Sequence, residues 1–286
     1  MIIEPSHLLI EPHELAARLD AADEDLVVVD CRHDLARPQW GAQAYAASHV
    51  PGALFAHLDH DLSDPVTPAS GRHPLPDLER LAAALGRWGI DRRVQVVAYD
   101  QDSSAVAARL WWLLRFLGHR RVAVLDGGFA AWRAAELPVS AERSARAARA
   151  FSAKPQLSAV VSTAEVARGL ARGEIVLVDA RSAERFAGRN ETLDPVAGHI
   201  PGARSHPFTR NLDARGRFLE PRALAAEWRE TLAGAQARSV VAMCGSGVTA
   251  CHNLIAMELA GLHGARLYAG SWSEWIRDPA RPVARD

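Results

Sequence analysis

The 286-residue sequence has few cysteines, no surplus of charge of either sign and no long apolar run. Three cysteines, none of them in a C-x-x-C pair, argue against a disulfide framework or a zinc site and for a reducing compartment. A net charge of −1 gives no reason to expect nucleic acid or an anionic membrane as a partner. No stretch approaches the roughly 20 apolar residues of a membrane span, and the N-terminus lacks the basic region of a secretory signal. We therefore expect a cytoplasmic protein.

The residues that are present form two similar halves. The first half contains "LVVVDCRHDL", "HVPGALF" and "VAVLDGGFAAW", and the second contains "IVLVDARSAERF", "HIPGARSHPF" and "ARLYAGSWSEW" in the same order. His49 and His199 lie in the paired H-x-P-G-A segments. Because both halves keep this histidine, we interpret it as a structural residue that holds a turn through hydrogen bonds. Gly127–Gly128 and Gly270–Ser271 are matched in the same way and are expected to open corresponding helices.

This duplication predicts two domains of one fold, residues 1–139 and 159–286, joined by an Ala-, Ser- and Arg-rich linker at 140–158. Within each half, short runs of Val, Ile and Leu alternate with helical patterns, which predicts an α/β fold with a parallel sheet and helices on both faces. In such sheets ligands bind at the carboxyl ends of the strands. The predicted strands are 26–30, 94–99, 122–125, 175–179, 239–243 and 265–268. The predicted helices, each closed by a glycine, are 76–89, 103–118, 221–234 and 249–261.

A single thiol, Cys244, lies where a predicted buried strand turns into a helix, in "VVAMCGSGVTACHNL". A helix N-terminus presents unpaired N–H groups and a partial positive charge, and the two loop glycines let successive N–H groups turn inward. The sequence thus predicts an anion cradle that favours the thiolate and holds an anionic atom attached to it. The alternative is a buried, inert cysteine, which is how we interpret Cys31 and Cys251. The first half places Asp100 at the matching turn, so the fold itself does not require a cysteine there.

The duplicated architecture together with "GHIPGA", "CGSGVTA" and "GSWSEW" resembles the two-domain rhodanese superfamily, and within it the 3-mercaptopyruvate sulfurtransferases more than the thiosulfate sulfurtransferases. The loop Gly245–Thr249 is neutral, which suits a monoanionic keto acid better than a compact dianion. The resemblance implies that sulfane sulfur moves through a persulfide on Cys244 to cyanide or to an acceptor thiol, such as that of thioredoxin. It implies no metal and no organic cofactor.

The resemblance also implies substrate-binding residues. Arg185, in "SAERFAG", matches the family's carboxylate-binding arginine. The family's mercaptopyruvate enzymes carry a second arginine nine residues later, where this sequence has Asp194, and Arg189 is the candidate substitute. The expected donor-binding positions in the loop are Gly245, Gly247, Val248 and Thr249.

The family further pairs the loop serine with a histidine and an aspartate from the first domain. The matching residues are Ser246, His73 in "GRHPLPD" and Asp59 in "FAHLDHDL", which together would polarise the donor carbonyl or move a proton. His57 and His60 are close competitors for the histidine. The first domain, which has no loop thiol, would then act as a non-catalytic lid.

Three other functions compete with this interpretation. Thiosulfate could be the donor in the same mechanism. A cysteine phosphatase shares the strand–loop–helix design but needs an arginine six residues after the cysteine, where this chain has Ala250. A rhodanese-type module used only for binding is the third alternative, and the intact "CGSGVTA" loop argues against it.

Overall fold

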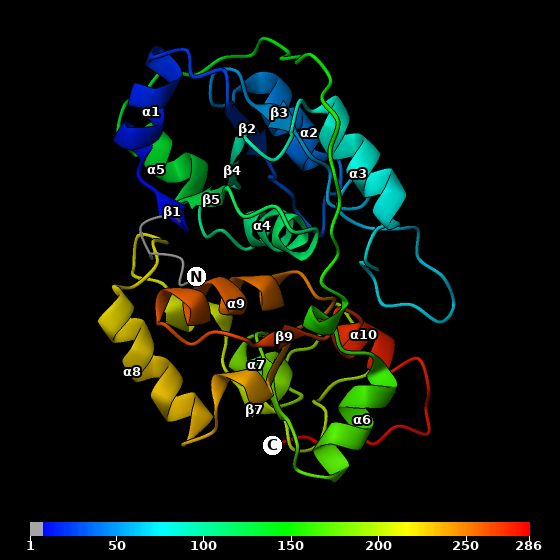
Figure 1. Ribbon diagram of the computed structural model, residues 1–286. Coiled ribbons are helices and arrows are strands. Elements are labelled where there is room, and N and C mark those ends of the chain that lie inside the picture. The colour runs from blue at the N-terminus through cyan, green and yellow to red at the C-terminus, as the bar shows by residue number, and fades with distance from the viewer. Residues whose placement is uncertain (1–7) are drawn as a thin grey trace. The chain divides into compact units, whose positions relative to one another are not determined.

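The computed structural model describes residues 8–286, which form two compact units, each built on one parallel β-sheet (Figure 1). The first unit runs to Asp64 and also contains Pro76–Gln156 and Ala214–Phe218. The second unit contains Pro65–Leu75, Leu157–Asp213 and Leu219–Asp286. Packing therefore divides the chain differently from the two halves of the sequence, because an eleven-residue segment of the first half packs with the second unit. Within residues 8–286, no helix is both long and apolar enough to cross a membrane.

The first unit contains a five-stranded sheet in the order β1-β5-β4-β2-β3, with all neighbours parallel. Helices α1, α2 and α5 share a core with side chains of one face, among them Val28, Val97 and Tyr99, while α4 packs on β4 and β5. The strands are β1 Leu9–Ile10, β2 Leu26–Asp30, β3 Leu54–Phe55, β4 Gln95–Tyr99 and β5 Val122–Leu125. The helices are α1 Pro12–Asp20, α2 Trp40–Ala47, α3 Leu78–Arg87, α4 Ala107–Phe116 and α5 Gly128–Ala134.

The second unit contains a four-stranded parallel sheet in the order β7-β6-β8-β9. Val241 and Met243 share a core with α6 and α10, so alternate residues of β8 face the opposite side, where α9 packs together with α8 (Figure 1). The strands are β6 Val176–Asp179, β7 Arg204–Ser205, β8 Val240–Met243 and β9 Arg266–Leu267. The helices are α6 Thr163–Ala171, α7 Ala183–Phe186, α8 Pro221–Leu232, α9 Thr249–Leu259 and α10 Ser271–Trp275, with 3₁₀ turns η2 Leu157–Ala159, η3 Phe208–Asn211 and η4 Ala237–Ser239.

The predicted fold class, two copies of a parallel sheet covered by helices, is confirmed. The long predicted strands match β2, β4, β5, β6 and β8 closely, because each is a run of buried aliphatic residues. The predicted glycine stops are also present. Gly89, Gly118 and Gly261 follow α3, α4 and α9 with φ values of +76°, +84° and +76°, a conformation that glycine adopts without steric cost.

The duplicated histidines hold matching turns. Nδ1 of His49 lies 2.6 Å from the carbonyl oxygen of Tyr45, and the two rings stack. Nδ1 of His199 lies 2.8 Å from the carbonyl oxygen of Phe186, and its ring stacks on that phenylalanine in the same way. Both side chains are buried, which agrees with the structural role expected from their presence in both halves.

Each unit also contains a buried ion pair that the sequence analysis did not predict. Arg32 binds Asp30 and Arg181 binds Asp179, in both cases with a nitrogen–oxygen distance of 2.7 Å. Each arginine donates a further hydrogen bond to the backbone carbonyl that precedes the duplicated histidine. The end of the strand is thereby connected to the H-x-P-G-A turn in both units.

Candidate active site

The loop after β8 surrounds the sulfur of Cys244 with main-chain donors. The N–H of Gly247 donates to Sγ at 3.1 Å and the N–H of Ser246 lies 3.5 Å from it, while only 2% of the residue is exposed. The positive φ of Gly247, +77°, turns its N–H inward. A Cβ on that glycine would lie 2.4 Å from the carbonyl oxygen of Ala269, so a side chain has no room there. The structure therefore shows the convergence of amides on sulfur that the sequence suggested.

The matching turn of the first unit holds a carboxylate in place of the thiol. Asp100 accepts hydrogen bonds from the backbone N–H groups of Ser104, Val106 and Ala107 at 2.9, 2.7 and 3.1 Å. Burial raises the pKa of Asp100 above its ordinary value, and these three N–H bonds act against that effect. Because a buried acidic group occupies this turn, the turn geometry itself suits an anion, in keeping with a helix N-terminus.

Ser246 and His73 are in direct contact. Nδ1 of His73 lies 2.7 Å from Oγ of Ser246, and both side chains are buried. His73 belongs to the segment 65–75 of the second unit, whose backbone is fixed by a hydrogen bond of 3.0 Å from the N–H of Arg72 to Oγ of Ser273. A Cβ on Gly71 would lie 2.6 Å from the carbonyl oxygen of Gly270, so this approach requires glycine. Two members of the predicted relay are thus placed together within one unit.

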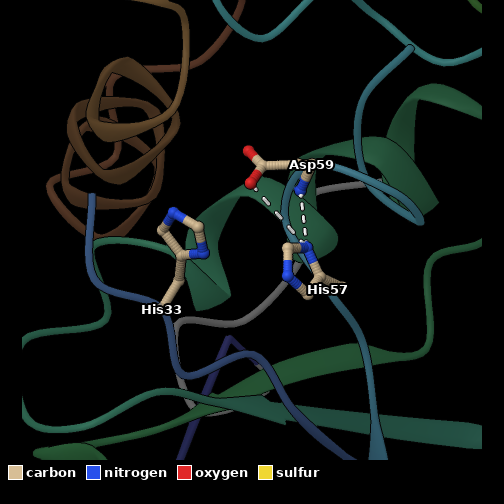
Figure 2. A group of neighbouring side chains, drawn as sticks. All are labelled: His33, His57 and Asp59. Carbon is tan, nitrogen blue, oxygen red and sulfur yellow. Dashed lines mark hydrogen bonds and ion pairs between the residues drawn. The ribbon is translucent and has the colours of Figure 1, made fainter. Parts of the chain in front are cut away.

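Asp59 lies in the first unit beside His57. Its N–H donates to Nδ1 of His57 at 3.1 Å, and its Oδ2 lies 3.9 Å from the same nitrogen (Figure 2). The ring of His60 lies 4.4 Å from that of His57, centroid to centroid. The part of Asp59 in the relay stays a prediction.

Within the described residues, one group of side chains has the chemistry of a metal site. His33, His57 and Asp59 each offer one ligand atom, and these atoms lie within 4.8 Å of one another (Figure 2). Imidazole and carboxylate ligands suit zinc and related ions. One nitrogen of His57 already accepts the N–H of Asp59, however, so the group is not a set of three uncommitted ligands.

Arg185 is held by two acidic residues next to the loop. Its Nε lies 3.0 Å from both carboxylate oxygens of Glu191, and its Nη2 lies 2.9 Å from Oδ2 of Asp194. Burial favours the protonated form of Glu191, but the hydrogen bonds and charge of Arg185 together with the backbone N–H groups of Leu193 and Asp194 outweigh it, and the pKa of Glu191 is lowered. Burial raises the pKa of Asp194 in spite of the neighbouring arginines. Arg185 is thus held in place by these two carboxylates, and its part in donor binding stays a prediction.

The position after the thiol faces two guanidinium groups. A Cβ on Gly245 would lie 2.7 Å from Nη2 of Arg72 and 3.6 Å from both Nη atoms of Arg185. Arg72 forms an ion pair with the remaining oxygen of Asp194, Oδ1. Sequence reasoning missed Arg72, although an acidic residue at a position where the family has a cation was a signal that another cation would be nearby.

The remaining predicted positions are placed as follows. Arg189 is exposed, and within residues 8–286 its side chain shows no ion pair with the acidic residues beside Arg185. Val248 is buried and caps α9, and Thr249 is the first residue of that helix. Ala250, the position where a phosphatase loop would carry its arginine, is fully buried in α9.

Comparisons with known proteins agree with this architecture. Residues 11–135 and 162–278 both match the family model for the rhodanese-like domain. A protein of Pseudomonas aeruginosa named "Probable 3-mercaptopyruvate sulfurtransferase" is 50% identical over 278 residues, which are 96% of this chain and 97% of that protein. The thiosulfate sulfurtransferase of Gallus gallus is 34% identical, over 82% of this chain and 80% of its own. The solved structure of the 3-mercaptopyruvate sulfurtransferase from Leishmania major has a TM-score of 0.81 at 32% identity, covering 96% of this chain and 75% of that one.

Proposed function

The chain belongs to the rhodanese-like family in its two-domain form and is a sulfurtransferase, and we propose that it takes sulfane sulfur from 3-mercaptopyruvate through a persulfide on Cys244. The observation that carries the proposal is the position of Sγ, which faces two main-chain N–H groups of an uncharged loop next to a pair of guanidinium groups. An anionic sulfur is stabilised by the N–H groups, and a carboxylate on the donor is attracted by the arginines.

The first step transfers one sulfur atom from the donor. The Cys244 thiolate attacks the sulfur of 3-mercaptopyruvate, so that an S–S bond forms and the C–S bond of the donor breaks. The electron pair of that bond forms the carbon–carbon double bond of the enolate of pyruvate. The proton of the donor thiol passes to the enolate oxygen, and a persulfide anion remains on the enzyme. We expect the terminal sulfur, which carries the negative charge, to be stabilised by the same loop N–H groups that contact Sγ of Cys244.

We assign the proton movement to Ser246 and His73. A hydroxyl group 2.7 Å from an imidazole nitrogen can donate to a developing oxyanion while it is itself hydrogen-bonded to that nitrogen. Arg185 holds the donor carboxylate, which orients the carbonyl toward this pair. Asp59 remains the predicted third member of the relay.

The second step returns the enzyme to its starting state. An acceptor nucleophile attacks the terminal sulfur of the persulfide, and the Cys244 thiolate leaves as the S–S bond breaks. Cyanide would become thiocyanate, and a thiol would become a persulfide. Thioredoxin is the protein acceptor that we propose, and the cytoplasm is the compartment that would keep its thiols reduced.

The test uses the Cys244→Ser variant with Cys31→Ala as the matched control. Cys31 is a second buried thiol in the other unit, so the control tests whether loss of a cysteine as such matters. We expect the Cys244 variant to lose sulfur transfer from mercaptopyruvate to cyanide down to trace levels. Mass spectrometry of the unmodified protein after incubation with mercaptopyruvate should show one added sulfur atom on Cys244. Sulfur transfer that persists in the Cys244→Ser variant would overturn the proposal.

Thiosulfate is the alternative donor, because a relative named thiosulfate sulfurtransferase matches most of the chain and because cationic groups face the loop. The loop residues themselves are uncharged, which favours the keto acid. Comparison of kcat/KM for the two donors decides between them. A higher value for thiosulfate would change the donor and leave the Cys244 persulfide unaffected.

A further inference from the structure

We propose that Arg72 is the second arginine of the donor-carboxylate site, and that the buried carboxylate of Asp194 positions it there. The inference rests on the proposed mercaptopyruvate donor. It assigns a specificity-determining role to a residue that neither the sequence pattern nor the resemblance to relatives points to. The ligand chemistry is that of a 2-oxo acid, whose carboxylate would bind between two guanidinium groups.

Asp194 bridges the two arginines. Its Oδ1 binds Arg72 and its Oδ2 binds Nη2 of Arg185 at 2.9 Å, while only 2% of its side chain is exposed. A buried carboxylate that uses one oxygen for each guanidinium fixes the distance between them. Asp194 therefore does not contact the donor in this proposal but sets the geometry of the groups that do.

Both arginines keep donors that point at the loop. Arg72 uses Nη1 for Asp194, and its Nη2 is the atom that lies 2.7 Å from a Cβ built on Gly245. Arg185 uses Nε for Glu191 and Nη2 for Asp194, and both of its Nη atoms lie 3.6 Å from the same point. The side chains are 26% and 18% exposed, so a small anion from solvent can reach them. These donors converge on the residue that follows the nucleophilic thiol.

The backbone beside Arg72 is fixed in advance. Its N–H donates to Oγ of Ser273 at 3.0 Å, and the preceding glycine packs directly on the carbonyl of Gly270. The next residue is His73, which contacts Ser246. A single short segment thus brings a cation and an imidazole to the same loop, and binding of the donor would require little ordering of it.

Charge balance shows why a second cation is needed. The ion-paired group contains three arginines, Arg72, Arg185 and Arg181, and three carboxylates, those of Asp194, Glu191 and Asp179, so its charges balance when all three acids are ionised. Without Arg72, two arginines would remain with three carboxylates, and the net negative charge would repel a donor carboxylate. With Arg72 the charges of the group balance, and Nη atoms of both Arg72 and Arg185 lie near Gly245, where they can donate to an anion.

The experiment compares Arg72→Gln with the unmodified enzyme in the full chain. We expect KM for 3-mercaptopyruvate to rise at least tenfold and the inhibition constant of pyruvate, which keeps the carboxylate, to rise in parallel. The expected change in kcat is smaller, because the reacting sulfur and the Ser246–His73 pair are untouched. Arg222→Gln, an exposed arginine of α8, is the matched control and should leave all three constants within twofold. Unfolding midpoints of the variants check that each is folded.

Exchanging the charges of residues 72 and 194 shows whether KM depends on this particular ion pair or only on the loss of a positive charge. Arg72→Asp and Asp194→Arg should each raise KM, because each leaves like charges side by side. The double variant restores one cation and one anion in exchanged places, although the new cation at position 194 still lies beside Arg185, so we expect a partial recovery, with a KM below that of Arg72→Asp.

Three results would overturn the inference. The first is a change of less than twofold in KM for 3-mercaptopyruvate in Arg72→Gln. The second is a tenfold rise of this KM in Arg189→Gln instead. The third is a double variant that is folded but has a KM no lower than that of Arg72→Asp. The proposed function fails separately, when the unmodified enzyme forms no Cys244 persulfide from mercaptopyruvate.

Discussion

Gly245 and Gly247 flank the same serine but are glycines for different reasons. At Gly247 a side chain would meet the backbone oxygen of Ala269, and the positive φ adds strain. At Gly245 a side chain would meet the far end of Arg72, which can move aside. Gly247 is therefore needed for the conformation of the turn itself, and Gly245 leaves open the space in which a donor carboxylate would bind.

This difference predicts separate effects for two alanine variants. Gly247→Ala should lower the free energy of unfolding by at least about 2 kcal/mol, because backbone must shift at a left-handed position. Gly245→Ala should change it by less than about 1 kcal/mol and raise KM for the keto-acid donor severalfold, because only a side-chain tip is displaced. Urea unfolding and steady-state kinetics measure both. Equal loss of stability in the two variants would contradict this explanation.

Single residues of the site were predictable to different degrees. Cys244 and its glycines form a local pattern with a direct physical meaning, so the sequence alone indicated an anion cradle. Ser246 and His73 lie far apart in the chain, and only the resemblance to a family paired them. Arg72 was missed, because its position depends on an ion pair with Asp194 across more than a hundred residues of sequence, and Asp194 signalled a missing cation without indicating which residue supplies it.

At the scale of secondary-structure elements, a buried polar network joins η3, α8 and α9 in the second unit. Nδ1 of His206 lies 2.6 Å from Oγ1 of Thr231, and its Nε2 lies 3.0 Å from Oδ1 of Asn211. Its ring stacks on Trp228. Burial lowers the pKa of His206 to about 4. The helices are thus packed around an imidazole that must stay neutral.

The pH dependence of stability follows from that imidazole. Its pKa is lower in the folded than in the unfolded protein, so its contribution is complete above about pH 6.5 and is lost as the pH falls toward 4. A pKa shift of this size lowers the free energy of unfolding by about 3 kcal/mol at pH 4 relative to pH 7. Other groups titrate in the same range, so the measurement compares His206→Gln with the unmodified protein. We expect a shallower loss of unfolding free energy between pH 7 and 4.5 in the variant, and parallel curves would contradict the assignment.

Elements were predictable where they were long and buried. The aliphatic strands β2, β4, β5, β6 and β8 and the amphipathic helices α3 and α8 stood out from the sequence. Strands β1, β3, β7 and β9 have two residues each, which is too short for any period to appear, and of these only β9 was predicted, as the longer run 265–268. Their existence depends on pairing with a neighbouring strand, and that information is not local.

At the scale of the whole molecule, the segment 65–75 is the feature that a repeat-based analysis misses. The duplication correctly indicated two copies of one fold, but it also suggested that each half of the sequence supplies its own unit. Packing assigns this segment of the first half to the second unit, where it brings Arg72 and His73 to the Cys244 loop. The second half shows a matching exchange, because Ala214–Phe218 belongs to the first unit, and comparison of the two halves of the sequence reveals neither assignment.

A polypeptide of residues 159–286 tests the importance of that segment. It contains Cys244, Arg185 and the complete loop but lacks residues 65–75. We expect less than 1% of the kcat/KM of the full chain for the keto-acid donor, and a partial return when residues 1–158 are supplied as a separate chain. Circular dichroism of the fragment separates loss of the segment from loss of structure. A folded fragment with more than a tenth of the full activity would show that the segment is dispensable.

The assignment of residues 65–75 to the second unit also has a consequence for the order in which the site is completed during translation. Arg72 is made 201 residues before Ser273, whose Oγ accepts its N–H, and the neighbouring Gly71 packs against Gly270. The contacts that hold this segment at the Cys244 loop therefore cannot form during translation until residues 270–273 have been added. If the two halves were made as separate chains, we expect neither to be active until they associate, because residues 65–75 and the Cys244 loop would lie on different chains.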